Sequence, residues 1–576
     1  MRSCLALVFL AACAAPSPAP RTAAAARGSD APRGPTPTAQ APTEPARLLP
    51  PRRPVTETLH GITLTDPFRS LENLEDPEVK RWLAAEGARA REALARLPER
   101  EAFLGRLREL SDELVAPIAL ERRRGVEIFR RRDPGSEVFR LYVRDPSGGA
   151  PRLLFDPNEQ RGDAHHVSID WAALSPDGRH VALNLSRDGS ESGVVRILRV
   201  ADGSLLPEEI PNALPGVKWL EDATLQYETR ASSAAHSMDL WRDVRTKLHT
   251  VGRPVADDIT VFGRGVDPGI PHSEGDFVTF ATLPKSPYLL AERTHGVRPY
   301  QEIFVTPKKG YSPSRGVWTK VTEVDDEIRG KALHGQELYL LTTKDAPYGK
   351  VLRVPLARPR LDAAETLAVG TQTNILQSLH PAKEGVYLLS RAIAESALVR
   401  LPTPGEKGAK VVALPAGVSV GLSTSAEERG ARLYVTSWKA PPRWFALETP
   451  DGPLAPVPLA PPSRFTGEDL EAERVWAKSA DGTAVPLSIV RKRGLPLDGK
   501  RPTYLTAYGA YGTSMLAGLS SLAAALAERD GVYAVCHVRG GGELGEPWRK
   551  AGFQLEKRHT WEDAIGCAQW LIEHRY

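Results

Sequence analysis

The sequence predicts a seven-bladed β-propeller followed by the first part of a doubly wound α/β domain. Three observations carry this prediction. Short strand-like runs recur at steps of 45 to 61 residues through the middle of the chain, strands and helices alternate after residue 470, and two amphipathic helical stretches precede both regions. A chain of 576 residues also exceeds what one hydrophobic core usually serves, so several domains are expected.

The N-terminus is expected to be a targeting segment. Arg2 and the apolar run from Cys4 to Leu10 have the layout of a signal peptide, and this run is too short to span a bilayer. The sequence Leu-Ala-Ala-Cys over residues 10–13 resembles a bacterial lipoprotein signal, in which the cysteine carries the lipid. We therefore expect a signal over residues 1–13 with the lipid on Cys13; an ordinary secretory signal with a chance cysteine is the alternative.

Residues 14–46 are expected to be a disordered tether. They are rich in Ala, Pro, Thr and Ser and contain almost no aliphatic side chains, so they cannot build a core. Signal and tether together predict that the globular part is lipid-anchored in the bacterial cell envelope and faces the periplasm or the exterior.

A helical part is predicted over residues 47–118, and we expect it to belong to the same α/β domain as the C-terminal segment. Asp76 is a good helix cap and Pro77 suits the first helical position. Apolar residues then recur at helical spacing over residues 79–97, and a second amphipathic stretch covers residues 103–110.

The propeller is predicted over residues 119–468, where helical periodicity gives way to short strands and Gly, Pro and Asp turns. An apolar-aromatic strand that follows a turn recurs seven times. Repeats of about 40 to 50 residues with several strands each are typical of propellers, so we expect seven blades; a large β-sandwich array is the alternative. The seven runs are residues 126–129, 181–183, 224–227, 287–290, 337–340, 385–388 and 432–435.

The segment over residues 469–576 is predicted to be the start of the α/β domain. Strands alternate with helices there, which indicates a doubly wound sheet. We expect strands at residues 485–490, 503–507 and 532–538 and helices at residues 516–529 and 560–574.

Composition excludes several classes of protein. The net charge is only +4 and no strongly basic stretch stands out, which argues against nucleic-acid binding. The four cysteines are too few and too scattered for a disulfide framework, and no C-x-x-C pair or Cys/His cluster suggests zinc. We expect no metal and no cofactor. The cysteines are Cys4, Cys13, Cys536 and Cys567.

Six short motifs resemble those of the prolyl oligopeptidase family of serine peptidases, and they occur in the family's order. Each is weak alone, but the ordered set is specific, and the resemblance runs from about residue 50 to the last residue. They are D-P-F-R-S-L-E at 66–72, S-P-D-G at 175–178, T-T-K-D-A-P at 342–347, S-A-D-G-T-A-V-P at 479–486, Y-G-A-Y-G at 508–512 and V-R-G-G-G-E-L-G-E-P-W at 538–548.

The resemblance implies an α/β-hydrolase capped by a propeller, with a Ser–His–Asp triad and an oxyanion hole. It assigns one oxyanion donor to the hydroxyl of Tyr508 and an aromatic wall of the proline pocket to Tyr511. Two positions depart from the family pattern, Ala510 in place of a glycine and Arg549 in place of a histidine. The active-site loop is expected to contain Arg539, Gly540, Gly541, Gly542 and Glu543.

The triad itself has no candidate in the C-terminal segment. We predict no G-x-S-x-G turn anywhere in the chain, Ser514 lacks the closing glycine, and neither His537 nor His559 is a convincing base. We therefore expect the domain to be truncated before its nucleophile. The glycines after Val538 also satisfy G-x-G-x-x-G, but Pro547 and Gly552 make the next segment a poor helix, which argues against a dinucleotide site.

The resemblance predicts a serine endopeptidase that cleaves short peptides on the carboxyl side of proline, inactive as this chain alone. It implies proline-containing peptides as partners, no nucleic acid, membrane contact through the N-terminal lipid only, and a monomer when complete. The alternative is a non-catalytic propeller lipoprotein that binds peptides or envelope partners.

Overall fold

The computed structural model describes residues 48–114, 116–160, 166–189, 193–230, 241–281, 283 and 286–576. The predicted signal, the lipid-bearing Cys13 and the tether over residues 14–46 lie outside these residues. The described chain divides into two compact units, one up to Leu104 and one from Gly105 to Tyr576. No helix in the described ranges is long and apolar enough to cross a membrane.

The first unit contains a hairpin that the sequence analysis did not predict. Strands β1 (Val55–Leu59) and β2 (Ile62–Asp66) pair antiparallel, and the two turn residues between them, His60 and Gly61, both have positive φ angles, as a tight hairpin requires. A short 3-10 helix, η1, follows at Arg69–Glu72.

Helix α1 (Pro77–Ala95) begins as predicted. The carboxylate of Asp76 accepts hydrogen bonds from the backbone N–H groups of Glu78 and Val79, and Pro77 occupies the first helical position. Helix α2 (Arg100–Leu114) follows and contains the second amphipathic stretch.

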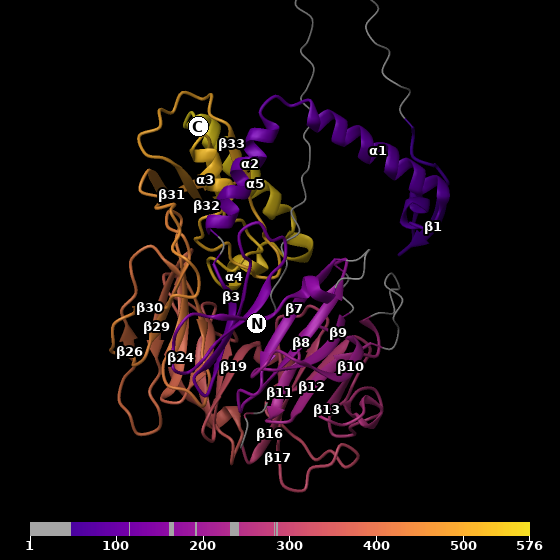
Figure 1. Ribbon diagram of the computed structural model, residues 1–576, viewed down its shortest axis with the longest axis vertical. Coiled ribbons are helices and arrows are strands. Elements are labelled where there is room, and N and C mark those ends of the chain that lie inside the picture. Colours follow the sequence, from indigo (N-terminus) through magenta and orange to yellow (C-terminus); the bar gives the residue numbers. More distant parts are fainter. Residues whose placement is uncertain are drawn as a thin grey trace, which may run out of the picture. The chain divides into compact units, whose positions relative to one another are not determined.

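Within the described residues, strands β3 to β30 form seven consecutive sets of four antiparallel strands, which are the blades of a propeller (Figure 1). Five sets are separate sheets, whereas the second and third share one eight-stranded sheet through a single pair, Ala213 with Thr229. Blades one to three contain β3 Ile118–Arg123, β4 Val126–Arg131, β5 Arg140–Arg144, β6 Arg152–Phe155, β7 Val167–Leu174, β8 His180–Arg187, β9 Gly193–Arg199, β10 Leu205–Ala213, β11 Lys218–Glu221, β12 Thr224–Thr229, β13 Arg245–Thr250 and β14 Ile259–Phe262.

Blades four to seven follow the same order. They contain β15 Asp276–Phe280, β16 Tyr288–His295, β17 Glu302–Pro307, β18 Thr319–Lys320, β19 Ile328–His334, β20 Glu337–Thr342, β21 Lys350–Pro355, β22 Glu365–Val369, β23 Ile375–Ala382, β24 Gly385–Ala392, β25 Glu395–Arg400, β26 Lys410–Val412, β27 Ser419–Ser423, β28 Ala431–Thr436, β29 Arg443–Leu447 and β30 Ala455–Pro456.

The seven runs of the sequence analysis are the second strands of the seven blades, namely β4, β8, β12, β16, β20, β24 and β28. A second strand has a neighbour on each side within its sheet and other blades against its faces, which explains its continuous apolar character. Tyr339 and Tyr387, on β20 and β24, are accordingly fully buried. The prediction of a β-propeller is confirmed.

The ring closes where the last blade packs on the first. Phe129 and Tyr142 of the first blade share a hydrophobic cluster with Trp444 of the seventh, and the Trp444 indole N–H donates to the carbonyl of Pro117 (2.7 Å). This closure excludes an open β-sandwich array.

The C-terminal segment forms a four-stranded sheet in the order β31-β32-β34-β33. Only β33 and β34 are parallel, so the sheet changes from antiparallel to parallel at β34. Three helices and a 3-10 turn accompany the strands. The elements are β31 Leu470–Lys478, β32 Ala484–Lys492, β33 Thr503–Thr506, α3 Ser521–Ala527, β34 Val532–Cys536, α4 Glu546–Lys550, η7 Gln554–Glu556 and α5 Arg558–Glu573.

The helix predicted over residues 516–529 was wrong at its start. Ala517 bonds instead to two propeller hydroxyls: its N–H donates to Ser419 (3.2 Å) and its carbonyl accepts from Thr436 (2.5 Å). Ser520 then caps α3 by accepting from the N–H of Ala523. Tertiary hydrogen bonds therefore override the helical propensity of the Ala- and Leu-rich segment.

Cys536 and Cys567 form a disulfide, which the sequence analysis did not predict. They are 31 residues apart in sequence, but β34 and α5 pack together and bring their Cα atoms to 6.2 Å. Both lie fully buried in the core of the α/β sheet. Cys4 and Cys13 lie outside the described residues.

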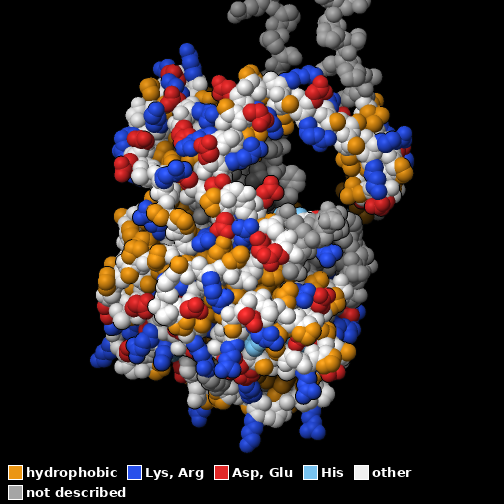
Figure 2. Space-filling view, in the orientation of Figure 1, with side chains coloured by type: hydrophobic (Ala, Val, Ile, Leu, Met, Phe, Trp, Pro, Cys, Tyr) orange, Lys and Arg blue, Asp and Glu red, His pale blue; other side chains and the backbone are white. Residues whose placement is uncertain are grey.

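Figure 2 shows acidic and basic side chains interspersed over the visible face.

Candidate functional site

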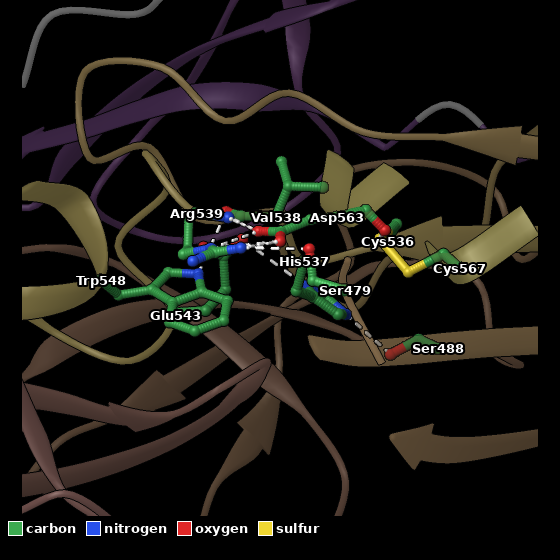
Figure 3. Close-up of a disulfide and its surroundings, with 10 residues drawn as sticks. All are labelled: Ser479, Ser488, Cys536, His537, Val538, Arg539, Glu543, Trp548, Asp563 and Cys567. Carbon is green, nitrogen blue, oxygen red and sulfur yellow. Dashed lines mark hydrogen bonds and ion pairs between the residues drawn. A yellow bond between two sulfur atoms is a disulfide. The ribbon is translucent and has the colours of Figure 1, made fainter. Parts of the chain in front are cut away.

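Arg539 is the centre of a buried ion cluster directly after β34. Its guanidinium donates to Asp563 of α5 (Nη2 to Oδ1, 2.6 Å) and to the hydroxyl of Ser479 (3.1 Å) (Figure 3). It also donates to Asp481 (Nη1 to Oδ2, 2.6 Å). The hydrogen bonds from Arg539 hold the pKa of Asp481 well below its usual range. Two motifs that are separate in the sequence, S-A-D-G and R-G-G-G, therefore meet on one guanidinium.

The glycines of the R-G-G-G loop are required by close backbone packing against residues 508–512. Gly540 has φ 94°, and a Cβ placed on it would lie 2.1 Å from the carbonyl oxygen of Gly509. A Cβ on Gly542 would lie 2.3 Å from the carbonyl oxygen of Gly512. The N–H of Gly512 in turn donates to the Gly540 carbonyl (3.0 Å). The two loops are thus held together by backbone contacts that no larger residue allows.

The two tyrosines predicted for the site lie on the other loop. Tyr508 follows β33 and is half-buried, whereas Tyr511 is 61% exposed and has φ 56°. The ammonium of Lys557 donates to the Gly509 carbonyl and secures the start of this turn. Ala510 does not have a positive φ, so the alanine in place of the family's glycine introduces no backbone strain. The structure brings Tyr508 and Tyr511 to the loop packed on residues 540–542.

A Ser–His–Glu arrangement exists in the core, and sequence reasoning did not find it. The hydroxyl of Ser488 lies 2.8 Å from Nε2 of His537, and Nδ1 of His537 lies 3.5 Å from the carboxylate of Glu543 (Figure 3). The exposed fractions of the three residues are 2%, 0% and 2%. Ser488 is in the middle of β32 with strands on both sides, so no substrate can reach it. We conclude that these three residues have a structural role in the core of the sheet.

The prediction that the chain has no G-x-S-x-G was wrong as a statement about the sequence, because residues 417–421 read G-V-S-V-G. The serine of this match, Ser419, lies in propeller strand β27 and is buried. The hydroxyl donates to the Ala394 carbonyl and accepts from the N–H of Ala517. A nucleophile would need an exposed turn between a strand and a helix, so Ser419 is not one. Across the described ranges, no group of His, Cys, Asp and Glu could hold a metal ion.

Helix α4 joins the R-G-G-G-E loop to the propeller. The Glu546 carboxylate accepts from the hydroxyl of Tyr300 (2.9 Å), from Arg329 (2.5 Å) and from Arg549 (2.5 Å), and its N–H donates to the carbonyl of Pro347 (3.0 Å). The propeller motif T-T-K-D-A-P thus contacts the first residue of α4 directly. Beside this contact is an open cleft of about 470 Å³, lined by Asp325, Glu327, Thr343, Lys344, Asp345, Ala346, Pro347, Glu546, Pro547 and Lys550.

Two descriptions of known protein families match this chain. The family description "Prolyl oligopeptidase, N-terminal beta-propeller domain" matches residues 49–458, and "Prolyl oligopeptidase family" matches residues 518–576. The chain belongs to the prolyl oligopeptidase family. The catalytic part of the family is only partly present in this chain.

Relatives in this family carry different names. A prolyl endopeptidase of Elizabethkingia meningoseptica is 25% identical over 533 residues, which are 90% of this chain and 72% of that protein. Dipeptidyl aminopeptidase BI of Pseudoxanthomonas mexicana is 26% identical over 557 residues, 91% of this chain and 73% of that protein.

Solved structures agree on the fold. One from a study of two prolyl endopeptidases has a TM-score of 0.80 at 26% identity and covers 92% of this chain and 77% of its own. Prolyl oligopeptidase B of Galerina marginata, bound to a macrocyclization substrate, has a TM-score of 0.79 at 20% identity with the same coverages, which supports the fold alone.

Sequence reasoning missed the partners of Arg539 and the network around Glu546. One signal was present: Asp563 is a charged residue beside the apolar positions Ala564 and Cys567 of α5, and a carboxylate there needs a buried cation. No local pattern pointed to Glu546, because its partners Tyr300 and Arg329 are more than 200 residues away.

Proposed function

We propose that the chain contributes the propeller and the oxyanion side of a serine endopeptidase that cleaves short peptides on the carboxyl side of proline. The observation that carries this proposal is the packing of residues 508–512 on residues 540–542, which brings Tyr508 and Tyr511 to the loop of the R-G-G-G-E motif. The family membership supports the reaction class, and the names of the relatives support peptide substrates.

In this proposal Tyr508 donates its hydroxyl to the oxygen that becomes negatively charged when the peptide carbonyl is attacked. A donor held in place before the reaction stabilises this charge without reorganisation. Tyr511 offers an exposed aromatic ring, against which the apolar pyrrolidine ring of a proline can pack. Arg539 and Glu543 stabilise the R-G-G-G-E loop from within the fold. Both are buried, Arg539 donates to Asp563, and Glu543 accepts from the N–H of Met515.

Attack on the carbonyl needs a serine on an exposed turn between a strand and a helix, with a base beside it. The serine–histidine pairs found among the described residues do not lie on such a turn: Ser378, bonded to His380 (2.7 Å), lies within propeller strand β23. The serine of the G-x-S-x-G match is buried in the propeller, and the serine bonded to His537 is buried in the sheet. We therefore propose that residues 1–576 alone do not hydrolyse peptides, and that a form of the protein that includes a nucleophile does.

The experiment compares purified 576-residue chain with a form extended through the downstream reading frame. Both are given a blocked Gly-Pro chromogenic substrate and a serine-directed fluorophosphonate. We expect turnover and labelling only in the extended form. Turnover by the 576-residue chain, or labelling of Ser419 or Ser488, would contradict the proposal. Peptide binding without turnover in both forms would favour the non-catalytic propeller lipoprotein.

The same experiment includes a chromogenic dipeptide substrate with an unblocked N-terminus, because one relative is named a prolyl endopeptidase and another a dipeptidyl aminopeptidase. Endopeptidase action predicts faster cleavage of blocked peptides with proline at an internal position. Faster cleavage of the free dipeptide would contradict that specificity.

We also propose that the protein is anchored by lipid on Cys13 in the bacterial cell envelope. The Leu-Ala-Ala-Cys sequence supports the lipid, and the disulfide between Cys536 and Cys567 supports an oxidising compartment. Expression of Cys13→Ala in a bacterial host tests this: we expect loss of incorporated radiolabelled palmitate and release from the membrane fraction. Unchanged membrane association and labelling would contradict the anchor.

A further inference from the structure

Arg549 departs from the family pattern, which has histidine at this position, and it lies inside a buried ionic network. Its exposed fraction is 6%, and it donates from Nε to both carboxylate oxygens of Glu546 (3.0 Å each) and from Nη2 to the hydroxyl of Tyr300 (3.2 Å). Its guanidinium also lies over the ring of Phe553, 5.1 Å from the centroid. An arginine held at this many points has one conformation available.

Glu546 collects donors from both sides of the contact between α4 and the propeller. Arg549 comes from the same helix, whereas Arg329 comes from propeller strand β19 and Tyr300 from the residues before β17. The carboxylate is only 4% exposed. Burial alone would raise the pKa of Glu546, but the hydrogen bonds from Arg549 and the charges of Arg329 and Arg549 outweigh it, and the pKa lies below its ordinary value. A buried carboxylate needs this compensation to remain charged.

The two arginines meet again at Gly512, the last residue of the Y-G-A-Y-G turn. A Cβ on Gly512 would lie 2.9 Å from Cδ of Arg549 and 3.2 Å from Nη2 of Arg329. Gly512 has φ 68°, and its N–H is bonded to the Gly540 carbonyl. The turn that carries Tyr511 therefore lies against the aliphatic part of the Arg549 side chain and the guanidinium of the propeller's Arg329, and the Glu546 carboxylate bonds to both arginines.

We propose that Glu546 is a positioning residue, which holds Arg549 and the propeller's Arg329 against Gly512 and thereby fixes the turn that presents Tyr508 and Tyr511. The propeller is then a structural part of the site as well as a cover for it. The catalytic meaning of this inference rests on the proposed peptidase function; the positional claim does not.

The test uses the whole 576-residue chain labelled with 3-fluorotyrosine, and observes ¹⁹F NMR lines assigned by Tyr508→Phe and Tyr511→Phe. In Glu546→Gln we expect the Tyr511 line to shift and broaden. Glu327→Gln is the matched control: it removes the same charge from the same contact, where Glu327 pairs with Lys550 (3.0 Å), but has no bond to either arginine. We expect it to leave the Tyr511 line unchanged. Glu546→Asp retains the charge and should restore most of the native line.

Arg329→Ala gives an independent reading in case Glu546→Gln does not fold. We expect the same shift of the Tyr511 line, and no further shift in the double variant, because both changes release the same turn. An unchanged Tyr511 line in a folded Glu546→Gln or Arg329→Ala chain would overturn the proposal, as would shifts that simply add. None of these readings requires turnover. If the extended form fails to cleave prolyl substrates while the Tyr511 line responds as stated, the peptidase function fails and the positioning role stands.

Discussion

Removal of the charge on Asp563 should loosen one part of the molecule in particular. Asp563 is fully buried in α5, and its carboxylate accepts from Nε and Nη2 of Arg539 and from the Arg539 backbone N–H (2.8 Å). The substitution Asp563→Asn keeps the shape and leaves a buried guanidinium with one carboxylate fewer. Breaking one side of a buried ion pair costs about 3 to 5 kcal/mol.

The lower end of this range applies, since Asp481 stays bonded to Arg539 and compensates part of its charge. A loss of about 3 kcal/mol corresponds to roughly 150-fold more frequent opening. Hydrogen exchange followed by mass spectrometry measures this directly. We expect amides of β34 and α5 to exchange about two orders of magnitude faster, because opening of this sheet is the step that exposes them, while propeller amides keep their native rates.

Asp481→Asn is the control, because Asp481 makes the other half of the same cluster but its side chain is 39% exposed. Water screens an exposed pair, so the expected loss is about 1 kcal/mol or less. Equal effects of the two substitutions would refute the assignment of the energy to burial. Faster exchange throughout the propeller in Asp563→Asn would refute the claim that the cluster serves the α/β part locally.

Three further predictions follow from the same structure. Replacing Cys536 and Cys567 by serine, or reducing them, should lower the free energy of unfolding of the α/β part by about 3.7 kcal/mol, for cysteines 31 residues apart. Urea denaturation measures this loss, and an unchanged midpoint would contradict it. Gly540→Ala should prevent soluble folding, because its Cβ has no space, whereas Gly518→Ala, with nothing within 4 Å, should express normally; equal yields would contradict the packing argument. Ionised Glu546 stabilises the contact of α4 with the propeller at neutral pH. This contribution to stability is lost as the pH falls below the ordinary carboxyl pKa of 4.5 towards the lowered pKa of Glu546. In limited proteolysis between pH 5 and pH 3 the wild type should become sensitive and Glu546→Gln should change less, and parallel profiles of the two would contradict this prediction.

The sequence predicted the structure best where a pattern of apolar residues corresponds to a single kind of surroundings, as in the buried second strands of the blades. The second strand of each blade is buried on every side, so its apolar-aromatic pattern stands out, as at Tyr339 and Tyr387. The first hairpin was missed because its strands are mostly exposed and rich in threonine, with no core face to mark them. The helix over residues 516–529 was predicted too long because its propensity is local, whereas Ala517 is held by propeller hydroxyls about a hundred residues away.

In the candidate site, too, some features could be predicted from the sequence and others could not. The motifs identified both loops, and the structure places Tyr508, Tyr511 and Arg539 to Glu543 on them. The partners of these residues were invisible to the sequence analysis, because a pairing such as that of Glu546 with Arg329 depends on how blades and helices pack. The disulfide was missed for the same reason, since spacing along the chain says nothing of the 6.2 Å between the two Cα atoms.

Each blade is built from four consecutive strands, so the last sheet borrows no strand from the first. The chain enters the ring at β3 and leaves it after β30, and both passages lie at the junction of the first and seventh blades, which non-covalent contacts close. We therefore expect tension applied through the segments before β3 and after β30 to load this junction first. Under such a force the ring would open between its first and seventh blades.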